Sequence, residues 1–357
     1  MRVGGILVLG MALVAAGGCS HVEPIRGCEP RGAARPVCGF QNPEDLVVVP
    51  GTHLLIVSEY GALDGTRPGR LVLFDLATDA RTVLYAGGGD APADRWGDPS
   101  CPGPPTAAFS PHGIDLAPRR DGRLALYVVN HGGRESVELF EVLTGDGVAL
   151  AWRGCATAPP ESSLNDVAGL PDDGFMTTHM FERSSGRLRL AFAYLFGRDT
   201  GYVLEWHPAS GFSKVAGSAG AFDNGIAIAR DGASIYVNAT LGNTVRRIDR
   251  ATGRELARAE VRGPDNLNWA DGRLLVASIR AAPQDITACD GLNGGACPLP
   301  FAIVGLDPET LAQRELYAGE GPPMGAGTAA VEVDGELVIG SFAGDRVLRV
   351  RLPSAQN

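Results

Sequence analysis

The chain repeats one β-rich unit six times, and this internal repeat limits its fold more than any other feature. Each copy has a short polar start, an alternating apolar strand, a turn rich in Gly, Asp or Pro, and a second β-rich strand. The copies begin at Pro43, Pro111, Leu164, Phe222, Pro264 and Gly327. Their starts lie roughly forty to seventy residues apart, and a further strand pair follows, as in residues 69–85 after the first copy. The repeat therefore predicts units of four strands.

A sheet of four strands can bury both of its faces only against neighbouring sheets. A closed ring is therefore the arrangement that leaves no copy with an exposed apolar face. We expect an all-β fold, a six-bladed β-propeller with four-stranded blades, over residues 43–357. Residues 19–42 would form an N-terminal linker and the start of ring closure. In such a ring the first strand of each blade lies nearest the axis, so the polar residues at the copy starts should converge at one mouth of the channel.

Three segments interrupt the rhythm of the repeats. Residues 87–109 and 281–301 are long loops, and we favour a role for both as a cover over the channel mouth. Residues 187–196 are unusually apolar for an insertion. They predict either a short helix near the mouth, which would help an apolar substrate to enter, or an ordinary outer strand.

The N-terminus has the pattern of a targeting segment. Arg2 precedes an apolar stretch at residues 6–16 that is too short to span a bilayer comfortably, which predicts a signal peptide over residues 1–18. Small residues stand directly before Cys19, as where a lipoprotein signal is cut and the new N-terminal cysteine is acylated. An ordinary secretory signal cleaved nearby is the alternative. We expect an exported bacterial lipoprotein held by its lipid on the outer membrane, facing the periplasm or the cell surface.

The remaining cysteines are even in number, as expected where disulfides persist. Sequence does not fix their connectivity, and the choice with the shortest loops pairs Cys28 with Cys38, Cys101 with Cys155, and Cys289 with Cys297. Cysteines and histidines with zinc spacing are absent from the sequence, which disfavours a zinc site. The net charge of -10, without clustered Lys and Arg, argues against a nucleic-acid partner. The number of chains that assemble stays open.

Polar side chains, almost all of them oxygen donors, recur at the copy starts. They are Glu44 and Asp45, His112, Asn165 and Asp166, Asn224, and Asp265 and Asn266. Any single pair could begin a turn, but turn chemistry does not explain the same phase in five of the six repeats. Calcium takes about six to eight oxygen ligands, whereas zinc prefers His or Cys. The pattern therefore predicts a calcium site made by Glu44, Asn165, Asn224, Asp265 and Asn266. Coordination would remain for water and substrate.

Seven short motifs carry a family resemblance. They are PEDL at Pro43, PHGI at Pro111, LYVVNH at Leu126, SLND at Ser163, DNGIAIARDG at Asp223, PDNLNW at Pro264 and LVIGSF at Leu337. In this order they resemble the paraoxonase/arylesterase family, a calcium-containing six-bladed propeller, over most of the mature chain. The resemblance implies two calcium ions per chain. It assigns Glu44, Asn165, Asn224, Asp265 and Asn266 to the catalytic calcium. It assigns Asp45, Asp166 and the carbonyl of Ile114 to a structural calcium. His112 and His131 match the family's histidine pair.

The chain departs from the family in two places. The family has a disulfide that ties its first strand region to its last strand, and Val350 stands where the second cysteine of that bond is expected. Closure of the ring must therefore rely on strand pairing. The family's Asn-Asp-His run in the third blade is Thr177-Thr178-His179 here. This weakens the expectation that His179 contacts substrate, and substrate preference is expected to differ.

The function expected from these residues is calcium-dependent hydrolysis of small lactones and aryl esters. Calcium would polarise the carbonyl group, His112 would take a proton from the attacking water, and His131 would orient His112 or relay its proton. In a rival assignment a metal-bound carboxylate, Glu44 or Asp265, activates the water. Two rival functions are a gluconolactonase-type sugar lactonase and a non-catalytic calcium-binding propeller that binds partners at the cell surface.

Overall fold

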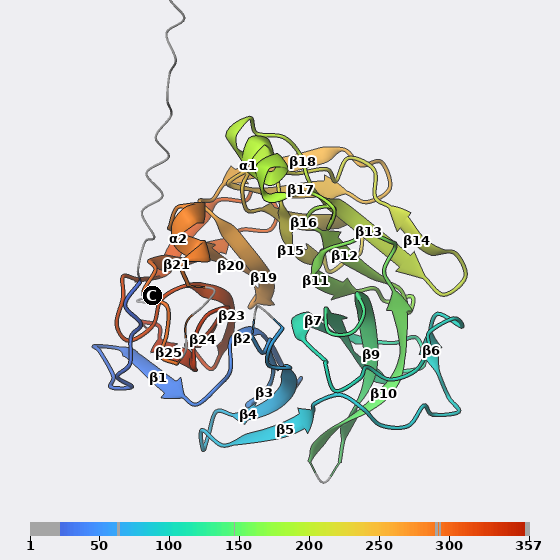
Figure 1. Cartoon of the computed structure of the whole chain (residues 1–357), viewed down its shortest axis with the longest axis horizontal. Helices are drawn as coiled ribbons and strands as arrows, with labels where there is room; N and C mark the ends of the chain where they lie inside the picture. Colours follow the sequence, from blue (N-terminus) through green and yellow to red (C-terminus); the bar gives the residue numbers. More distant parts are fainter. Residues whose placement is uncertain (1–21, 63–64, 146, 290–291, 293, 354–357) are drawn as a thin grey trace, which may run out of the picture.

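Sheets of antiparallel strands surround a central axis, each built from one copy of the repeat and the strands after it (Figure 1). This computed structural model describes residues 22–62, 65–145, 147–289, 292 and 294–353, and within them the strands form the predicted six-bladed propeller. Blades are numbered 1 to 6 by their inner strands, which begin at the predicted copy start or one residue later. These are β2 (Pro43–Val48), β7 (Pro111–Pro118), β11 (Leu164–Gly169), β15 (Asp223–Ile228), β19 (Pro264–Ala270) and β23 (Gly327–Val333).

Three further strands follow outward in each blade. The second strands are β3 (Leu54–Glu59), β8 (Leu124–Asn130), β12 (Phe175–His179), β16 (Ser234–Ala239), β20 (Arg273–Ile279) and β24 (Glu336–Ser341). The third strands are β4 (Arg70–Asp75), β9 (Ser136–Thr144), β13 (Tyr202–His207), β17 (Thr244–Asp249), β21 (Phe301–Leu306) and β25 (Arg346–Arg351). The fourth are β5 (Arg81–Tyr85), β10 (Val148–Thr157), β14 (Gly211–Lys214), β18 (Glu255–Glu260), β22 (Gln313–Gly319) and, in blade 6, β1 (Ala34–Cys38).

The two ends of the described chain meet in blade 6. Strand β1 pairs antiparallel with β25, and Val350, which stands where the family has a cysteine, lies opposite Ala34 in this register. Because β1 comes from the N-terminal side and β23 to β25 from the C-terminal side, one sheet joins the beginning and the end of the chain. Strand pairing thus closes the ring, as the departure from the family pattern predicted.

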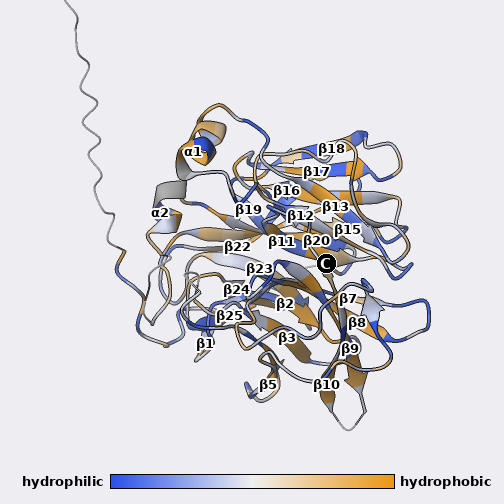
Figure 2. Cartoon of the chain, turned by 45° about the vertical axis from the view of Figure 1, so that its right-hand side comes forward, coloured by the Kyte–Doolittle hydropathy of each residue, from blue (hydrophilic) through white to orange (hydrophobic). Residues whose placement is uncertain are grey.

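Apolar side chains fill the spaces between neighbouring blades. Ile56 of β3 belongs to one buried cluster with Leu126 and Phe140 of blade 2, while Val57 packs with Val338 of blade 6. Alternate residues of a strand face opposite sides of its sheet, so each blade needs a neighbour on both sides. Figure 2 shows the consequence, since hydrophobic residues run along the strands and hydrophilic ones gather in the loops.

The segments that interrupt the repeats form local structure of their own. In residues 87–109, β6 (Trp96–Gly97) pairs with β10 as a fifth, outermost strand of blade 2, and Trp96 is buried beneath the guanidinium group of Arg119. The expectation of a cover over the mouth is therefore wrong for residues 96–97. The apolar insertion forms helix α1 (Arg187–Leu195) and not an outer strand. The segment 281–301 contains α2 (Pro283–Thr287), and its role as a cover stays a prediction.

The described cysteines pair as the shortest loops suggested. Cys28 bonds to Cys38, Cys101 to Cys155 and Cys289 to Cys297. The first bond fixes the segment before β1 to the end of that strand, and the second joins the 87–109 segment to β10. Among the described residues, neither helix is long and apolar enough to cross a membrane.

Candidate active site

Every inner strand breaks its pairing with the second strand directly after its first residue. The register shifts between Pro43 and Asp45, Pro111 and Ile114, Leu164 and Val167, Asp223 and Ile226, Pro264 and Leu267, and Gly327 and Ala330. The residues inside these breaks include Glu44, His112, Asn165, Asn224 and Asp265. A register shift of this kind bends a strand and changes the direction of its side chains. The same local irregularity therefore presents the predicted site residues of five blades.

Side chains from separate blades meet around Glu44. The Asn266 amide nitrogen donates to Glu44 Oε1 at 2.8 Å, although the two residues are 222 positions apart. His112 Nε2 lies 3.5 Å from the same oxygen. Asn224 donates a hydrogen bond to Asp265, whose carboxylate interacts electrostatically with Glu44. The structure thus brings residues of blades 1, 2, 4 and 5 into one cluster, as the repeat predicted.

Four buried oxygen atoms of the predicted set have no hydrogen-bond partner in the described part of the chain. They are Glu44 Oε2, Asn165 Oδ1, Asn224 Oδ1 and Asn266 Oδ1. Each such acceptor costs about 1–3 kcal/mol when it is left unpaired. The described residues contain no group of three or more His, Cys, Asp or Glu side chains that could hold a metal ion. A metal site at this place must therefore also use amide oxygens. Unpaired carboxylate and amide oxygens fit a hard cation such as calcium.

Burial also makes negative charge costly at this cluster. It raises the pKa of Glu44 to about 7, against the hydrogen bond from Asn266 and the electrostatic interaction with His131. Burial and then the charge of Glu44 raise the pKa of Asp265 well above its usual value. Two buried carboxylates so close together are stable in the ionised form only beside a positive charge. A cation at the same place as the unpaired oxygens would therefore stabilise the ionised carboxylates.

The residues predicted for the second calcium have a different environment. Asp45 accepts the backbone N–H groups of Leu46 and Ile114, both at 2.8 Å, and Asp166 accepts those of Val167 and Ile226 at 2.8 Å. Each carboxylate thus ties its own blade to the next one. Burial, followed by neighbouring carboxylate charge, raises the pKa of Asp45 and of Asp166. Repulsion between these charges is compatible with a cation, but the second calcium stays a prediction.

The predicted histidine pair forms directly. His112 Nδ1 lies 2.8 Å from His131 Nε2, and the rings of Tyr60 and His112 form a T-shaped pair with 5.1 Å between their centroids. Burial lowers the pKa of His112 to about 4, so this imidazole is neutral near pH 7. A neutral imidazole beside Glu44 can accept a proton.

Glu135 is a member of the site that the sequence analysis did not identify. Its Oε2 lies 2.9 Å from His131 Nδ1 and 2.9 Å from an Arg183 nitrogen, and its Oε1 accepts the N–H of Leu164 at 2.6 Å. Burial alone would raise the pKa of Glu135, but His131, Leu164 and Arg183 bring it below its usual value. Glu135 stands in the turn after β8, outside the copy starts. Its position four residues after His131 was the only signal.

His179 is the last residue of β12 and is completely buried. Its ring stacks on Tyr202 with 4.4 Å between the ring centroids, and its Nδ1 lies 3.4 Å from the backbone nitrogen of Ser163. In the register of blade 3 it lies opposite Leu164, which precedes Asn165. A stacked and buried ring supports the strand that carries Asn165, and substrate contact by His179 stays a prediction.

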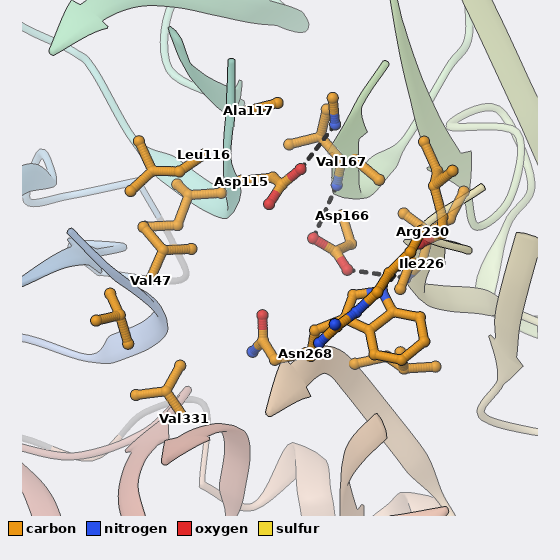
Figure 3. A pocket seen from close by; sticks show the side chains of 18 of the residues that line it. Val47, Asp115, Leu116, Ala117, Asp166, Val167, Ile226, Arg230, Asn268 and Val331 are labelled. Carbon is orange, nitrogen blue, oxygen red and sulfur yellow. Dashed lines mark hydrogen bonds between the residues drawn. The ribbon is translucent and has the colours of Figure 1, made fainter. Parts of the chain in front are cut away.

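A cavity of about 460 Å³ occupies the axis and is lined by all six inner strands (Figure 3). Of the predicted site residues, Ile114 and Asp166 line it. The Asp115 carboxylate also lies at this cavity and accepts the N–H of Gly169 at 2.7 Å. The cavity lies along the inner strands beyond the register breaks, next to the position predicted for the second calcium.

The comparison with protein families agrees with this geometry. The family model described as Arylesterase matches residues 41–348, which include every inner strand and both histidines of the pair. The chain belongs to the arylesterase family. A comparison of this arylesterase-family chain with curated protein sequences finds no significant match.

Solved structures show the same fold at low sequence identity. An aldose sugar dehydrogenase from Streptomyces coelicolor, bound to PQQ, is 14% identical with a TM-score of 0.54, covering 92% of the arylesterase-family chain and 100% of its own. A luciferin-regenerating enzyme is 15% identical with a TM-score of 0.51, covering 88% and 95%. The calcium-binding protein regucalcin from Agrobacterium tumefaciens is 14% identical with a TM-score of 0.50, covering 88% and 91%. At such identities these similarities establish the fold alone.

Proposed function

We propose that the chain is a calcium-dependent hydrolase of lactones and aryl esters. The main support comes from four buried oxygens, from four blades, that have no partner within the described part of the chain. One of them belongs to Glu44, whose other carboxylate oxygen lies 3.5 Å from His112 Nε2. Membership of the arylesterase family supports ester hydrolysis as the reaction class. The calcium-binding protein regucalcin has the same fold, which is compatible with a cation in such a ring.

The catalytic calcium would be held by Glu44, Asn165, Asn224, Asp265 and Asn266, and the second ion by Asp45, Asp166 and the carbonyl of Ile114. When bound, the first ion would polarise the ester carbonyl and stabilise the negative charge that develops on its oxygen. The second position lies where carboxylates already connect neighbouring blades, so its role would be structural.

His112 accepts a proton from the attacking water, and His131 orients it. The neutral form of His112 at pH 7, which burial favours, is the form that a general base requires. Its Nδ1 is engaged with His131 at 2.8 Å, which leaves Nε2 for the water. Tyr60 packs against both rings and limits their motion.

The experiment that tests this function is chelation followed by a panel of substrates. The protein as purified should contain two calcium ions and hydrolyse lactones and phenyl esters, and it should lose activity with chelator and regain it with calcium. Preference for sugar lactones would instead support the gluconolactonase-type alternative. Tight calcium binding without turnover on any ester would support a binding propeller, and a protein that binds no calcium would contradict the proposal.

We also propose that the mature protein begins at an acylated Cys19 and is held on the outer membrane of a bacterium. Residues 1–18 and Cys19 lie outside the described residues, so the support comes from the sequence pattern and from disulfides, which suit an oxidising compartment. Mass spectrometry of the N-terminal peptide should find an acylated cysteine at position 19. A mature protein that begins elsewhere, without lipid, would contradict the anchor.

A further inference from the structure

Glu135 connects two parts of the site that lie on different blades. One carboxylate oxygen, Oε2, lies 2.9 Å from His131 Nδ1 in blade 2. The other, Oε1, accepts the backbone N–H of Leu164, the first residue of β11 in blade 3, at 2.6 Å. The next residue, Asn165, is a proposed calcium ligand, and its amide oxygen has no partner among the described residues. A single buried side chain therefore contacts both the histidine pair and the strand that presents a cation ligand.

The contacts of Glu135 determine where the protons of the two rings lie. An ionised carboxylate only accepts hydrogen bonds, so His131 must carry its proton on Nδ1 and donate it to Glu135. In the neutral form of the His131 ring, Nε2 is then unprotonated and can only accept. His112 Nδ1, 2.8 Å away, must consequently donate, which leaves the lone pair of His112 on Nε2. That nitrogen lies 3.5 Å from Oε1 of Glu44, a proposed calcium ligand.

We propose that Glu135 is the positioning residue of the histidine pair, which fixes both tautomers so that the basic nitrogen of His112 faces Glu44, a proposed calcium ligand. This inference rests on the proposed function and adds Glu135, which has no role in that proposal, to the residues of the site. Arg183 assists, because its guanidinium group, 2.9 Å from Glu135 Oε2, favours the ionised carboxylate. Glu135 itself does not touch substrate.

The reaction step that this arrangement serves is attack of water on the ester carbonyl. One O–H bond of the water breaks, and its electron pair forms the bond from oxygen to the carbonyl carbon while the C=O π electrons move onto the carbonyl oxygen. The proton moves to His112 Nε2. The positive charge that His112 gains is compensated through His131 by the negative charge of Glu135, which accepts no proton in this step.

The test uses the calcium-loaded protein and its variant Glu135→Gln. An amide can supply only one accepting oxygen, and its NH₂ group can donate to His131 Nδ1, which favours the opposite tautomer. We expect kcat to fall on the order of 100-fold, with KM and calcium affinity changed by less than about twofold. Glu141→Gln is the matched control, because Glu141 is also a buried glutamate of blade 2. It lies in strand β9 and pairs with Arg153. The control should keep wild-type kcat.

Nitrogen NMR of the imidazole rings separates this inference from the proposed function. In the wild-type protein His131 should be protonated on Nδ1 and unprotonated on Nε2, whether or not any ester is hydrolysed, and this result would support the inference even if the hydrolase proposal failed. His131 protonated on Nε2 alone would overturn the inference. So would a Glu135→Gln variant that folds and retains more than half of the wild-type kcat, and this outcome would leave the hydrolase proposal intact.

Discussion

Asn165 illustrates at the scale of single residues why a cation is expected. Its amide nitrogen lies 3.2 Å from the Met180 sulfur, a weak acceptor, while its amide oxygen is buried without a partner among the described residues. A buried amide in this state destabilises the metal-free fold. Coordination of a cation would satisfy that oxygen. Replacing Asn165 with an apolar residue should therefore raise the stability of the metal-free protein and lower its affinity for the metal.

Replacing Asn165 with Leu, which is similar in size, should separate these two effects. Without metal, the variant should be more stable than wild type by about 1 kcal/mol, because an unpaired acceptor is removed. Its calcium affinity should fall at least about tenfold. Thermal unfolding in chelator and calcium titration measure the two quantities, and an unchanged calcium affinity would remove Asn165 from the ligand set.

Replacing His112 with Gln tests the assignment of the general base. We expect kcat for a lactone to fall by about 100-fold or more, since proton transfer by a positioned side chain contributes on that order. Calcium affinity should change little, because His112 is not among the predicted ligands. Near-full lactone turnover would exclude the histidine as the base and favour Glu44 or Asp265 as the activator of water.

At the scale of elements, the starts of the inner strands were predictable and their surroundings were not. Asn224 and Asp265 repeat the phase of Glu44, so sequence alone located them, and closure of the ring brought them together. Glu135 lies in a turn that repeats nowhere else, and its partner Leu164 is on another blade, so its role depends on tertiary structure. Strand β6 escaped prediction because two residues give no periodic signal. The apolar stretch at 187–196 suited both helix and strand.

Helix α1 exposes several large apolar side chains. Leu188, Phe192 and Leu195 are exposed by 88%, 57% and 74%. The helix borders a cavity of about 390 Å³ that Thr200 also lines. The Thr200 hydroxyl donates to the carbonyl oxygen of Met180, and the Met180 sulfur contacts Asn165. This short path is compatible with the predicted entrance for apolar substrates.

Serine at Phe192 and Leu195 should therefore impair turnover of apolar substrates selectively. KM for a long-chain lactone should rise several-fold, while kcat, the turnover of phenyl acetate and the thermal midpoint stay near wild type. Leu143→Ser is a suitable control, because Leu143 is 44% exposed in β9, in the hairpin that β9 forms with β10 in another blade. Equal effects on both substrates would indicate that α1 does not contribute to the entrance.

At the scale of the whole molecule, the buried carboxylates couple stability to pH. Burial raises the folded-state pKa of Glu44 from 4.5 to about 7, and the pKa values of Asp45, Asp166 and Asp265 are raised in the same direction. In this range the folded state binds more protons than the unfolded state. The free energy of unfolding of the metal-free protein therefore decreases as pH rises through the window from about 4.5 to 7.

The chelator-treated protein should accordingly become more stable as the pH is lowered from 8 to 5, and its thermal midpoint should rise by about 3 °C or more. Calcium should reverse the trend, because the ion stabilises the ionised carboxylates and must be released when they take up protons. Scanning calorimetry across this range, with and without calcium, measures both trends. Parallel pH dependence in the two conditions would contradict a cation beside these groups.

The central claim is that oxygens from separate blades surround one hard cation on the axis of the ring. The most direct test is a crystal structure of the calcium-loaded protein with anomalous scattering from the ion. We expect a peak at about 2.3–2.6 Å from oxygens of Glu44, Asn165, Asn224, Asp265 and Asn266. A peak confined to the outer surface, or these five side chains without any ion at saturating calcium, would contradict it.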